Sequence, residues 1–302
     1  MRERLPDRVE IVEVSPRDGL QNEPRAVPTS TKVAFIERLA AAGLKVIEAT
    51  SFVDPGRVPQ LADAADVLAR LRPSPDVRYP VLVPNERGLD RALAAGAREI
   101  AIFGSASEAF SQRNLGRSRE EAIEMFRPVV KRSRNAGLRV RAYLSMVVAD
   151  PWEGPIAPAS AVDAGLRLLD LGADELSLGD TIGVGTPASV GALIRACRDA
   201  GVPAAALAVH LHDTYGQGLA NVLAALELGV AIVDASAGGI GGCPFARSAT
   251  GNLATEDLVW MLDGMGIETG VDVRALAATS SWMANELGRE PPGRVARALA
   301  GG

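Results

Sequence analysis

Two histidines carry the strongest chemical signal in this sequence. His210 and His212 are the only histidines among 302 residues, and a single residue separates them. Residues two apart on a β-strand point to the same side, so both imidazoles would face one site if residues 207–211 form a strand. Histidine is the commonest metal ligand. The alternative is one packed histidine beside one surface histidine, and their place at the end of a predicted strand favours ligands.

An aspartate and an asparagine could supply oxygen atoms to the same site. Asp18 follows the first predicted strand, residues 11–14, and Asn252 follows the last, residues 231–235. Two imidazoles, a carboxylate and a carbonyl oxygen make a mixed set of nitrogen and oxygen ligands. Such a set suits Mg²⁺ or Mn²⁺ better than structural zinc. Taken alone, Asp18 would be interpreted as a helix N-cap or turn residue.

Three further residues have side chains suited to catalysis. Arg17 would stabilise an oxyanion at the site; its alternative role is an ion pair at the strand end. Glu48 interrupts an apolar strand, and a buried acid needs a partner such as Arg17. Cys243 follows four glycines within residues 238–242. This pattern favours a mobile lid that carries a catalytic thiol, with a chance cysteine as the alternative.

Eight β-rich runs alternate with amphipathic helical stretches along the chain. The runs are residues 11–14, 46–49, 79–83, 99–103, 140–147, 175–178, 207–211 and 231–235. Eight βα units in about 260 residues predict an α/β fold of the (β/α)8 TIM-barrel type. The alternative is an open doubly wound sheet, but no Gly-x-Gly-x-x-Gly motif follows the first run.

The predicted barrel brings the candidate residues to one end of the fold. Active sites of such barrels lie at the C-terminal ends of the strands, where these residues are found. We expect a catalytic barrel over residues 1–270 and a C-terminal helical cap over residues 271–302. The cap is interrupted by Pro291 and Pro292, and it is a candidate contact in a homo-oligomer of two or more chains.

Composition excludes several classes of function. The 32 Lys and Arg residues against 37 Asp and Glu give a net charge of −5, so we expect no nucleic-acid partner. No run of 18 apolar residues occurs, so we expect no membrane span. Two cysteines are too few for a disulfide scaffold, and residues 1–10 lack the apolar core of a signal peptide. These features predict a cytoplasmic protein.

Several motifs together resemble the 3-hydroxy-3-methylglutaryl-CoA (HMG-CoA) lyase family, within the superfamily of metal-dependent Claisen and aldolase TIM barrels. They are VEIVEVSPRDGLQNE at 9–23, EATSFV at 48–53, SLGDTIGVGTP at 177–187, HLHDTYGQ at 210–217, GGCPFA at 241–246 and GNLATED at 251–257. The resemblance runs over residues 9–271. One departure is Phe245, where many members of the family have a tyrosine.

The resemblance implies a reaction and roles for particular residues. The reaction is a metal-dependent retro-Claisen cleavage of HMG-CoA, an acyl-CoA substrate, to acetyl-CoA and acetoacetate. The divalent cation, Mg²⁺ or Mn²⁺, would be held by Asp18, His210, His212 and Asn252. The catalytic residues would be Arg17, Glu48, Asp180, His210 and Cys243.

The implied mechanism divides the proton transfers between two residues. His210 is the first choice for the base that deprotonates the substrate hydroxyl, and Asp180 is the alternative. Arg17 would stabilise the enolate oxygen, and Cys243 would protonate the enolate carbon. For the CoA phosphates the available cations are Arg113, Arg117 and Arg119, although surface arginines are usually solvated.

Three other interpretations stay open at this point. A lyase for a longer branched 3-hydroxyglutaryl-CoA would share most of the pattern. So would another metal-dependent aldolase or acyl-CoA condensing enzyme of the same superfamily. A non-catalytic barrel that senses acyl-CoA or metal would lack a catalytic position, and the sequence retains all of them.

Overall fold

A ring of parallel strands forms the centre of the computed structural model, which describes residues 5–72, 74–242 and 251–300. The strands are β1 (Glu10–Glu13), β2 (Val46–Ile47), β3 (Thr50–Ser51), β4 (Val81–Leu82), β5 (Glu99–Ser105), β6 (Arg139–Ser145), β9 (Glu175–Asp180), β10 (Leu207–Leu211) and β11 (Ile232–Ala235). Their order in the sheet is β2-β1-β11-β10-β9-β6-β5-β4-β3.

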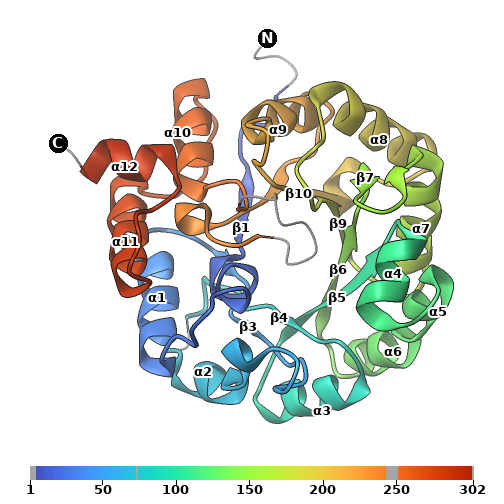
Figure 1. Ribbon diagram of the computed structural model, residues 1–302, viewed down its shortest axis with the longest axis horizontal. Coiled ribbons are helices and arrows are strands. Elements are labelled where there is room, and N and C mark those ends of the chain that lie inside the picture. Colours follow the sequence, from blue (N-terminus) through green and yellow to red (C-terminus); the bar gives the residue numbers. More distant parts are fainter. Residues whose placement is uncertain (1–4, 73, 243–250, 301–302) are drawn as a thin grey trace.

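The ring closes through one interrupted strand. β2 and β3 are separated by only two residues, and β2 pairs with β1 while β3 pairs with β4. The two ends of the sheet order therefore belong to the same stretch of chain. Eight strands result, and Figure 1 shows the helices surrounding them. The predicted (β/α)8 barrel is confirmed.

The helices form the outer layer of the barrel (Figure 1). They are α1 (Thr29–Ala41), α2 (Ala64–Arg70), α3 (Glu86–Ala94), α4 (Glu108–Leu115), α5 (Arg119–Glu124), α6 (Arg127–Asn135), α7 (Pro158–Asp170), α8 (Pro187–Asp199), α9 (Gly218–Glu227), α10 (Thr255–Met265), α11 (Val273–Glu286) and α12 (Arg294–Ala300). A small hairpin of β7 (Ala149–Asp150) and β8 (Gly154–Pro155) lies outside the ring order. No helix in the described ranges is both long and apolar enough to cross a membrane.

The amphipathic pattern of the sequence predicts single helices over residues 59–71 and 118–135, and both are divided in the structure. The stretch 118–135 forms α5 and α6, and Phe126 lies between them at the start of α6. Pro128 has no N–H to donate to the carbonyl four residues earlier, so a single helix cannot run through it. The stretch 59–71 likewise becomes a 3-10 turn at Pro59–Leu61 followed by α2.

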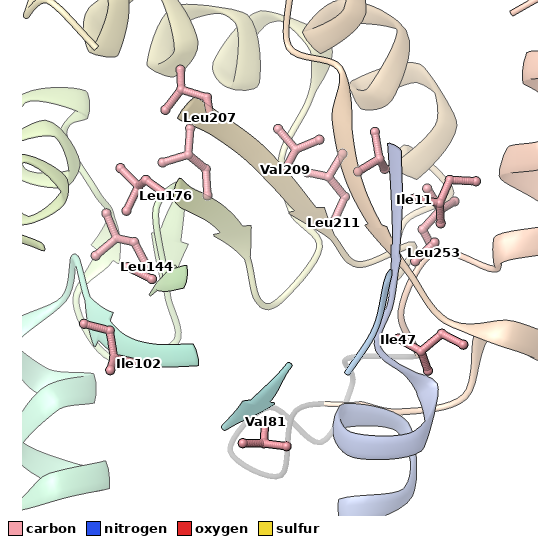
Figure 2. Close-up of a cluster of buried hydrophobic side chains, with 14 of the residues drawn as sticks. Ile11, Ile47, Val81, Ile102, Leu144, Leu176, Leu207, Val209, Leu211 and Leu253 are labelled. Carbon is pink, nitrogen blue, oxygen red and sulfur yellow. The ribbon is translucent and has the colours of Figure 1, made fainter. Parts of the chain in front are cut away.

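Two regions of the interior differ in chemistry. Strand residues such as Ile102, Leu144 and Leu176 belong to the main hydrophobic cluster (Figure 2). The same cluster includes Phe35 of α1, so it lies between the sheet and the helices. Strand residues that alternate with these face the inside of the ring. There the side chain of Arg141 is buried with charged partners. The inside of the barrel is therefore polar directly beneath its mouth.

The C-terminal helices pack on one sector of the ring. α11 contacts α1, α10 and α12, and α12 contacts α10. The N–H of Asp272 donates to the carbonyl of Ala42 at 2.8 Å, which fixes the start of α11 against the end of α1. The predicted helix after residue 271 is confirmed, while the division into a barrel over 1–270 and a cap over 271–302 stays a prediction.

Candidate active site

Three potential metal ligands converge at the mouth of the barrel. Asp18, His210 and His212 each offer a ligand atom, and these atoms lie within 4.8 Å of one another. The Nε2 atoms of the two histidines are 3.4 Å apart. The prediction that both imidazoles face one site is therefore confirmed. Ligands that converge in this way from separate strands can hold a metal ion.

Asp18 is presented by an unusual turn after β1. Residues Ser15–Gly19 form a short π-helix, and the carbonyl of Val14 accepts the N–H groups of Arg17 and Asp18 at 3.2 and 2.7 Å. Single π turns are frequent at functional sites. Burial alone would raise the pKa of the Asp18 carboxyl, but the charge of Arg17, together with the two histidines and the hydrogen bond from Asn252, lowers the pKa overall.

Asn252 joins the same group from the segment before α10. Its Nδ2 donates to Asp18 Oδ2 at 2.8 Å and lies 3.2 Å from the carbonyl of Ile240. Asn252 also forms an isolated β-bridge with His212. Its Oδ1 is buried and has no hydrogen-bond partner among the described residues. A buried carbonyl oxygen without a donor is unusual, and it fits a role as a fourth ligand.

Arg17 and Glu48 form a buried ion pair beside the potential ligands. Arg17 Nε donates to Glu48 Oε2 at 2.7 Å, and Arg17 Nη1 donates to Asp18 Oδ1 at 2.7 Å. Burial raises the pKa of the Glu48 carboxyl despite the opposing charge of Arg17. The guanidinium also lies 5.3 Å from the ring centre of Tyr143. The predicted partnership of Glu48 with Arg17 is confirmed.

Asp180 is oriented toward a loop. It ends β9, and its Oδ2 accepts the N–H of Gly185 at 2.7 Å. Its neighbours Gly179 and Thr181 line the cavity at the barrel mouth, while the Asp180 side chain is buried behind them. Burial raises the pKa of the Asp180 carboxyl, although backbone N–H groups of the loop lower it.

A cavity of about 860 Å³ opens above the potential ligands. Its lining includes Arg17, Asp18, both histidines and Tyr143 near the strand ends, and Arg57, Asn85, Phe110, Asn114 and Arg117 from the loops and helices around it. Pockets of this size hold small organic ligands. The site therefore combines a metal-binding corner with room for a substrate.

The three arginines considered for CoA phosphates have separate surroundings. Arg117 lines the cavity. Arg113 lies over the ring of Trp152 at 4.4 Å, and Arg119 donates to the carbonyls of Ala106 and Ser160. Only Arg117 of the three belongs to the described cavity lining.

Cys243 and Phe245 lie outside the described residues. The segment that leads to them does have an anchor, because the Asn22 side chain donates to the carbonyl of Gly242 at 2.7 Å. Gly242 itself lines the cavity. The predicted thiol therefore follows directly after a residue of the site.

Sequence reasoning missed Asp234, which lies behind His210. His210 Nδ1 is 3.3 Å from Asp234 Oδ2, and Arg141 Nη2 donates to Asp234 Oδ1 at 2.5 Å. Burial lowers the pKa of His210, but the hydrogen bond and charge of Asp234, together with the charge of Asp18, raise the pKa overall. The signal was present, since Asp234 interrupts an apolar strand just as Glu48 does.

Comparison with known proteins agrees with this geometry. A family model described as HMGL-like matches residues 8–283. The mitochondrial hydroxymethylglutaryl-CoA lyase of Rattus norvegicus is 51% identical over 97% of this chain and 90% of its own length. The cytoplasmic 3-hydroxy-3-methylglutaryl-CoA lyase of Danio rerio is 50% identical over 98% of this chain and 88% of its own length.

Solved structures extend the likeness to the whole fold. A hydroxymethylglutaryl-CoA lyase of Pseudomonas aeruginosa has a TM-score of 0.96 and 45% identity, with 99% of each chain covered. An HMG-CoA lyase of Acinetobacter baumannii in complex with coenzyme A and 3-methylmalate has a TM-score of 0.92 and 36% identity, covering 97% of this chain and 95% of that one. The fold and the site define a barrel of the Claisen and aldolase type. The chain belongs to the HMGL-like family.

Proposed function

We propose that this chain is a divalent-metal-dependent lyase that cleaves HMG-CoA to acetyl-CoA and acetoacetate. The observation that carries the proposal is the convergence of Asp18, His210 and His212 beside the buried Arg17 on the floor of a substrate-sized cavity. Relatives named as this lyase, about half identical over nearly the whole chain, support it. The coenzyme A complex of a structural relative supports an acyl-CoA substrate.

The four proposed metal ligands are Asp18, His210, His212 and Asn252. The mixed nitrogen and oxygen donors, and the unpartnered Oδ1 of Asn252, fit Mg²⁺ or Mn²⁺. When bound, such an ion supplies Lewis-acid polarisation of substrate oxygens. The chain's own contribution is to hold these side chains at one point, with Asp18 fixed by hydrogen bonds from Arg17 and Asn252.

Arg17 is proposed to stabilise the negative charge that develops on the thioester oxygen as the C2–C3 bond breaks. The electron pair of that bond passes to C2, and the charge is shared with the oxygen as an enolate. A preorganised donor in a dry site stabilises such charge strongly. Glu48 is proposed to orient the guanidinium, because its carboxylate holds Nε while Nη1 donates to Asp18, and Arg17 lines the cavity.

His210 is proposed as the base that removes the proton of the C3 hydroxyl, with Asp180 as the alternative. A base must reach the proton that it removes, and His210 lines the cavity whereas Asp180 lies behind the lining. The cavity-facing nitrogen of His210 is Nε2, since Nδ1 faces Asp234. His210 would therefore accept the proton at Nε2, and only while Nε2 does not bind the metal ion.

Cys243 is proposed to complete the reaction by protonating the enolate carbon. Its thiol hydrogen passes to C2, which yields acetyl-CoA. Before the next cycle the thiolate takes a proton from solvent, and His210 releases to solvent the proton that it took from the C3 hydroxyl. Acetoacetate carries away the former C3 oxygen as a ketone, so all atoms of the substrate are accounted for. The support for this role is the position of Cys243 next to Gly242, a residue of the cavity lining.

We also propose a cytoplasmic homo-oligomer. Two cysteines in 302 residues suit a reducing compartment. Trp260 on α10 is 58% exposed, which suits a surface that a second copy covers. Light scattering tests the oligomer: a mass of two or more chains is expected, and a mass of one chain overturns it.

The experiment that tests the proposed function measures both products. Purified protein with Mn²⁺ is incubated with HMG-CoA, and acetoacetate and acetyl-CoA are quantified by separate assays. We expect equal amounts of the two products. Cleavage of a longer branched 3-hydroxyglutaryl-CoA in preference to HMG-CoA would move the assignment to the longer substrate, and no cleavage of any of them would contradict the lyase.

A further inference from the structure

A charged network fills the inside of the barrel directly below the potential ligands. Arg141 on β6 donates from Nε to Glu175 Oε1 at 2.6 Å and from Nη2 to Asp234 Oδ1 at 2.5 Å. Asp234 Oδ2 accepts the hydroxyl of Ser177 at 2.9 Å and lies 3.3 Å from His210 Nδ1. All of these groups except His210 are buried almost completely.

The network fixes the charge and the hydrogen-bonding role of Asp234. Arginine keeps its proton in proteins, and a buried guanidinium requires an ionised partner. Arg141 donates to one oxygen of Asp234 and the Ser177 hydroxyl donates to the other, so Asp234 is a carboxylate, which accepts hydrogen bonds and cannot donate them. The atom that faces Oδ2 from His210 must therefore carry a proton.

His210 is held opposite Asp234 by the sheet itself. The two residues are register partners in neighbouring parallel strands, β10 and β11. Placing a proton on Nε2 instead would leave the lone pair of Nδ1 against a carboxylate oxygen, which is repulsive. Nε2 is also the nitrogen that lies 3.4 Å from His212 Nε2 within the ligand group.

We propose that Asp234 is a positioning residue that sets the tautomer of His210. By holding the proton on Nδ1, it leaves the lone pair on Nε2, the nitrogen that faces the cavity. That lone pair is what either a metal ligand or a proton acceptor requires. The inference deepens the proposed function and depends on it for the role of His210, but the tautomer itself is independent of substrate.

Replacement of Asp234 by asparagine makes a sharp test. The amide oxygen of Asp234→Asn must face Arg141, whose charge needs an acceptor, so the NH₂ group faces Ser177 and His210. The Ser177 hydroxyl rotates to accept, and His210 can accept only if its proton moves from Nδ1 to Nε2. The variant thus retains a partner for every group in the network, while it reverses the tautomer.

The tautomer is read directly by imidazole ¹⁵N NMR, because the chain has only two histidines. The spectra are recorded without metal at pH ~9, well above the ordinary imidazole pKa, and His212→Gln assigns the His210 signals. We expect Nδ1–H in the wild type and in Ser177→Ala, and Nε2–H in Asp234→Asn. An Nε2–H tautomer in the wild type overturns the proposal without any variant, and so does an unchanged tautomer in Asp234→Asn.

Metal affinity gives the second readout. Binding of Mn²⁺ followed by electron paramagnetic resonance should weaken about 10–100-fold in Asp234→Asn, as for other groups that orient a metal ligand. The exposed Asp163→Asn removes the same charge far from the network and should bind Mn²⁺ like the wild type. A reversed tautomer with unchanged Mn²⁺ affinity overturns the proposal. Absence of lyase activity would contradict the proposed function but would leave this inference standing, because neither the NMR readout nor the Mn²⁺ readout uses substrate.

Discussion

The side-chain amide of Asn252 donates to Asp18 Oδ2 at 2.8 Å, while its own Oδ1 is buried without a partner among the described residues. The amide therefore performs two tasks. Its nitrogen orients the carboxylate, and its oxygen is left available at the same point in space. This arrangement explains why an asparagine suits the position, since a carboxylate there would face Asp18 with like charge.

Replacement of Asn252 by alanine should weaken metal binding. The variant loses a proposed ligand and also the donor that orients Asp18, so we expect Mn²⁺ affinity to fall by about 10–100-fold or more. Titration followed by electron paramagnetic resonance measures it. Asn221→Ala is the matched control, because Asn221 is a buried asparagine whose Nδ2 bonds the Gly185 carbonyl outside the cavity lining. Equal affinity in both variants would remove Asn252 from the ligand set.

Replacement of Arg17 by methionine should damage both catalysis and stability. Loss of one preorganised donor costs about 10²–10³ in kcat, and leaving Glu48 buried without its cation costs about 3–5 kcal/mol of unfolding free energy. The double variant Arg17→Met/Glu48→Gln separates the effects. It should regain most of the stability in urea unfolding but none of the kcat; recovery of both would show that Arg17 is structural only.

Replacement of Cys243 by serine should abolish most of the turnover while leaving the fold intact. Proton transfer by a positioned group contributes about 10²–10⁴-fold, so kcat should fall in that range, with thermal stability unchanged. Cys197→Ala is the control, because Cys197 is buried and burial raises its pKa to about 11. Alkylation by iodoacetamide should inactivate Cys197→Ala and spare the residual activity of Cys243→Ser. Inactivation of both variants alike would contradict the assignment.

Stability should depend on pH through Glu256. Both of its oxygens accept the N–H of Gly238, and burial raises its pKa from 4.5 to about 7. Because the folded-state pKa of Glu256 lies above the unfolded value, its contribution to the free energy of unfolding is fully present below pH 4.5. That contribution is lost as the pH rises through about 7. Relative to the wild type, Glu256→Gln should therefore gain about 3 kcal/mol of unfolding free energy across that window.

Urea unfolding at pH ~3.5, below both pKa values, and at pH ~8, above both, measures this gain. Glu124→Gln is the matched control, because Glu124 is exposed and pairs with Arg127 on the surface. A pH-independent difference between Glu256→Gln and the wild type would contradict the raised pKa.

The sequence was sufficient for the barrel and for the ligand group because each depends on local patterns. Strand ends concentrate functional residues, so Asp18 and the two histidines could be placed together from their positions alone. Glu48 could be paired with Arg17 because a charge in an apolar strand requires a partner. These predictions needed only alternation within strands and their common direction.

Other features depend on contacts that local patterns do not specify. Asp234 meets Arg141 and His210 inside the ring, and strand periodicity gives the side of a residue but not its partner across the barrel. The short helix α4 also escaped prediction, because eight residues give too few turns for a clear apolar period. The orientation of Asp180 toward the 181–185 loop depends on backbone donors that only the folded loop supplies.

The central claim is that a divalent ion held by Asp18, His210 and His212 enables cleavage of HMG-CoA. The most direct test strips the protein of metal, adds Mn²⁺ in steps, and measures bound ion and acetoacetate release in the same samples. We predict no acetoacetate release without metal, and a rate of release that rises in step with metal occupancy up to one ion per chain. In His212→Ala, metal binding and acetoacetate release should both be lost. Full activity in the stripped protein, or bound ion without any release, would contradict the account.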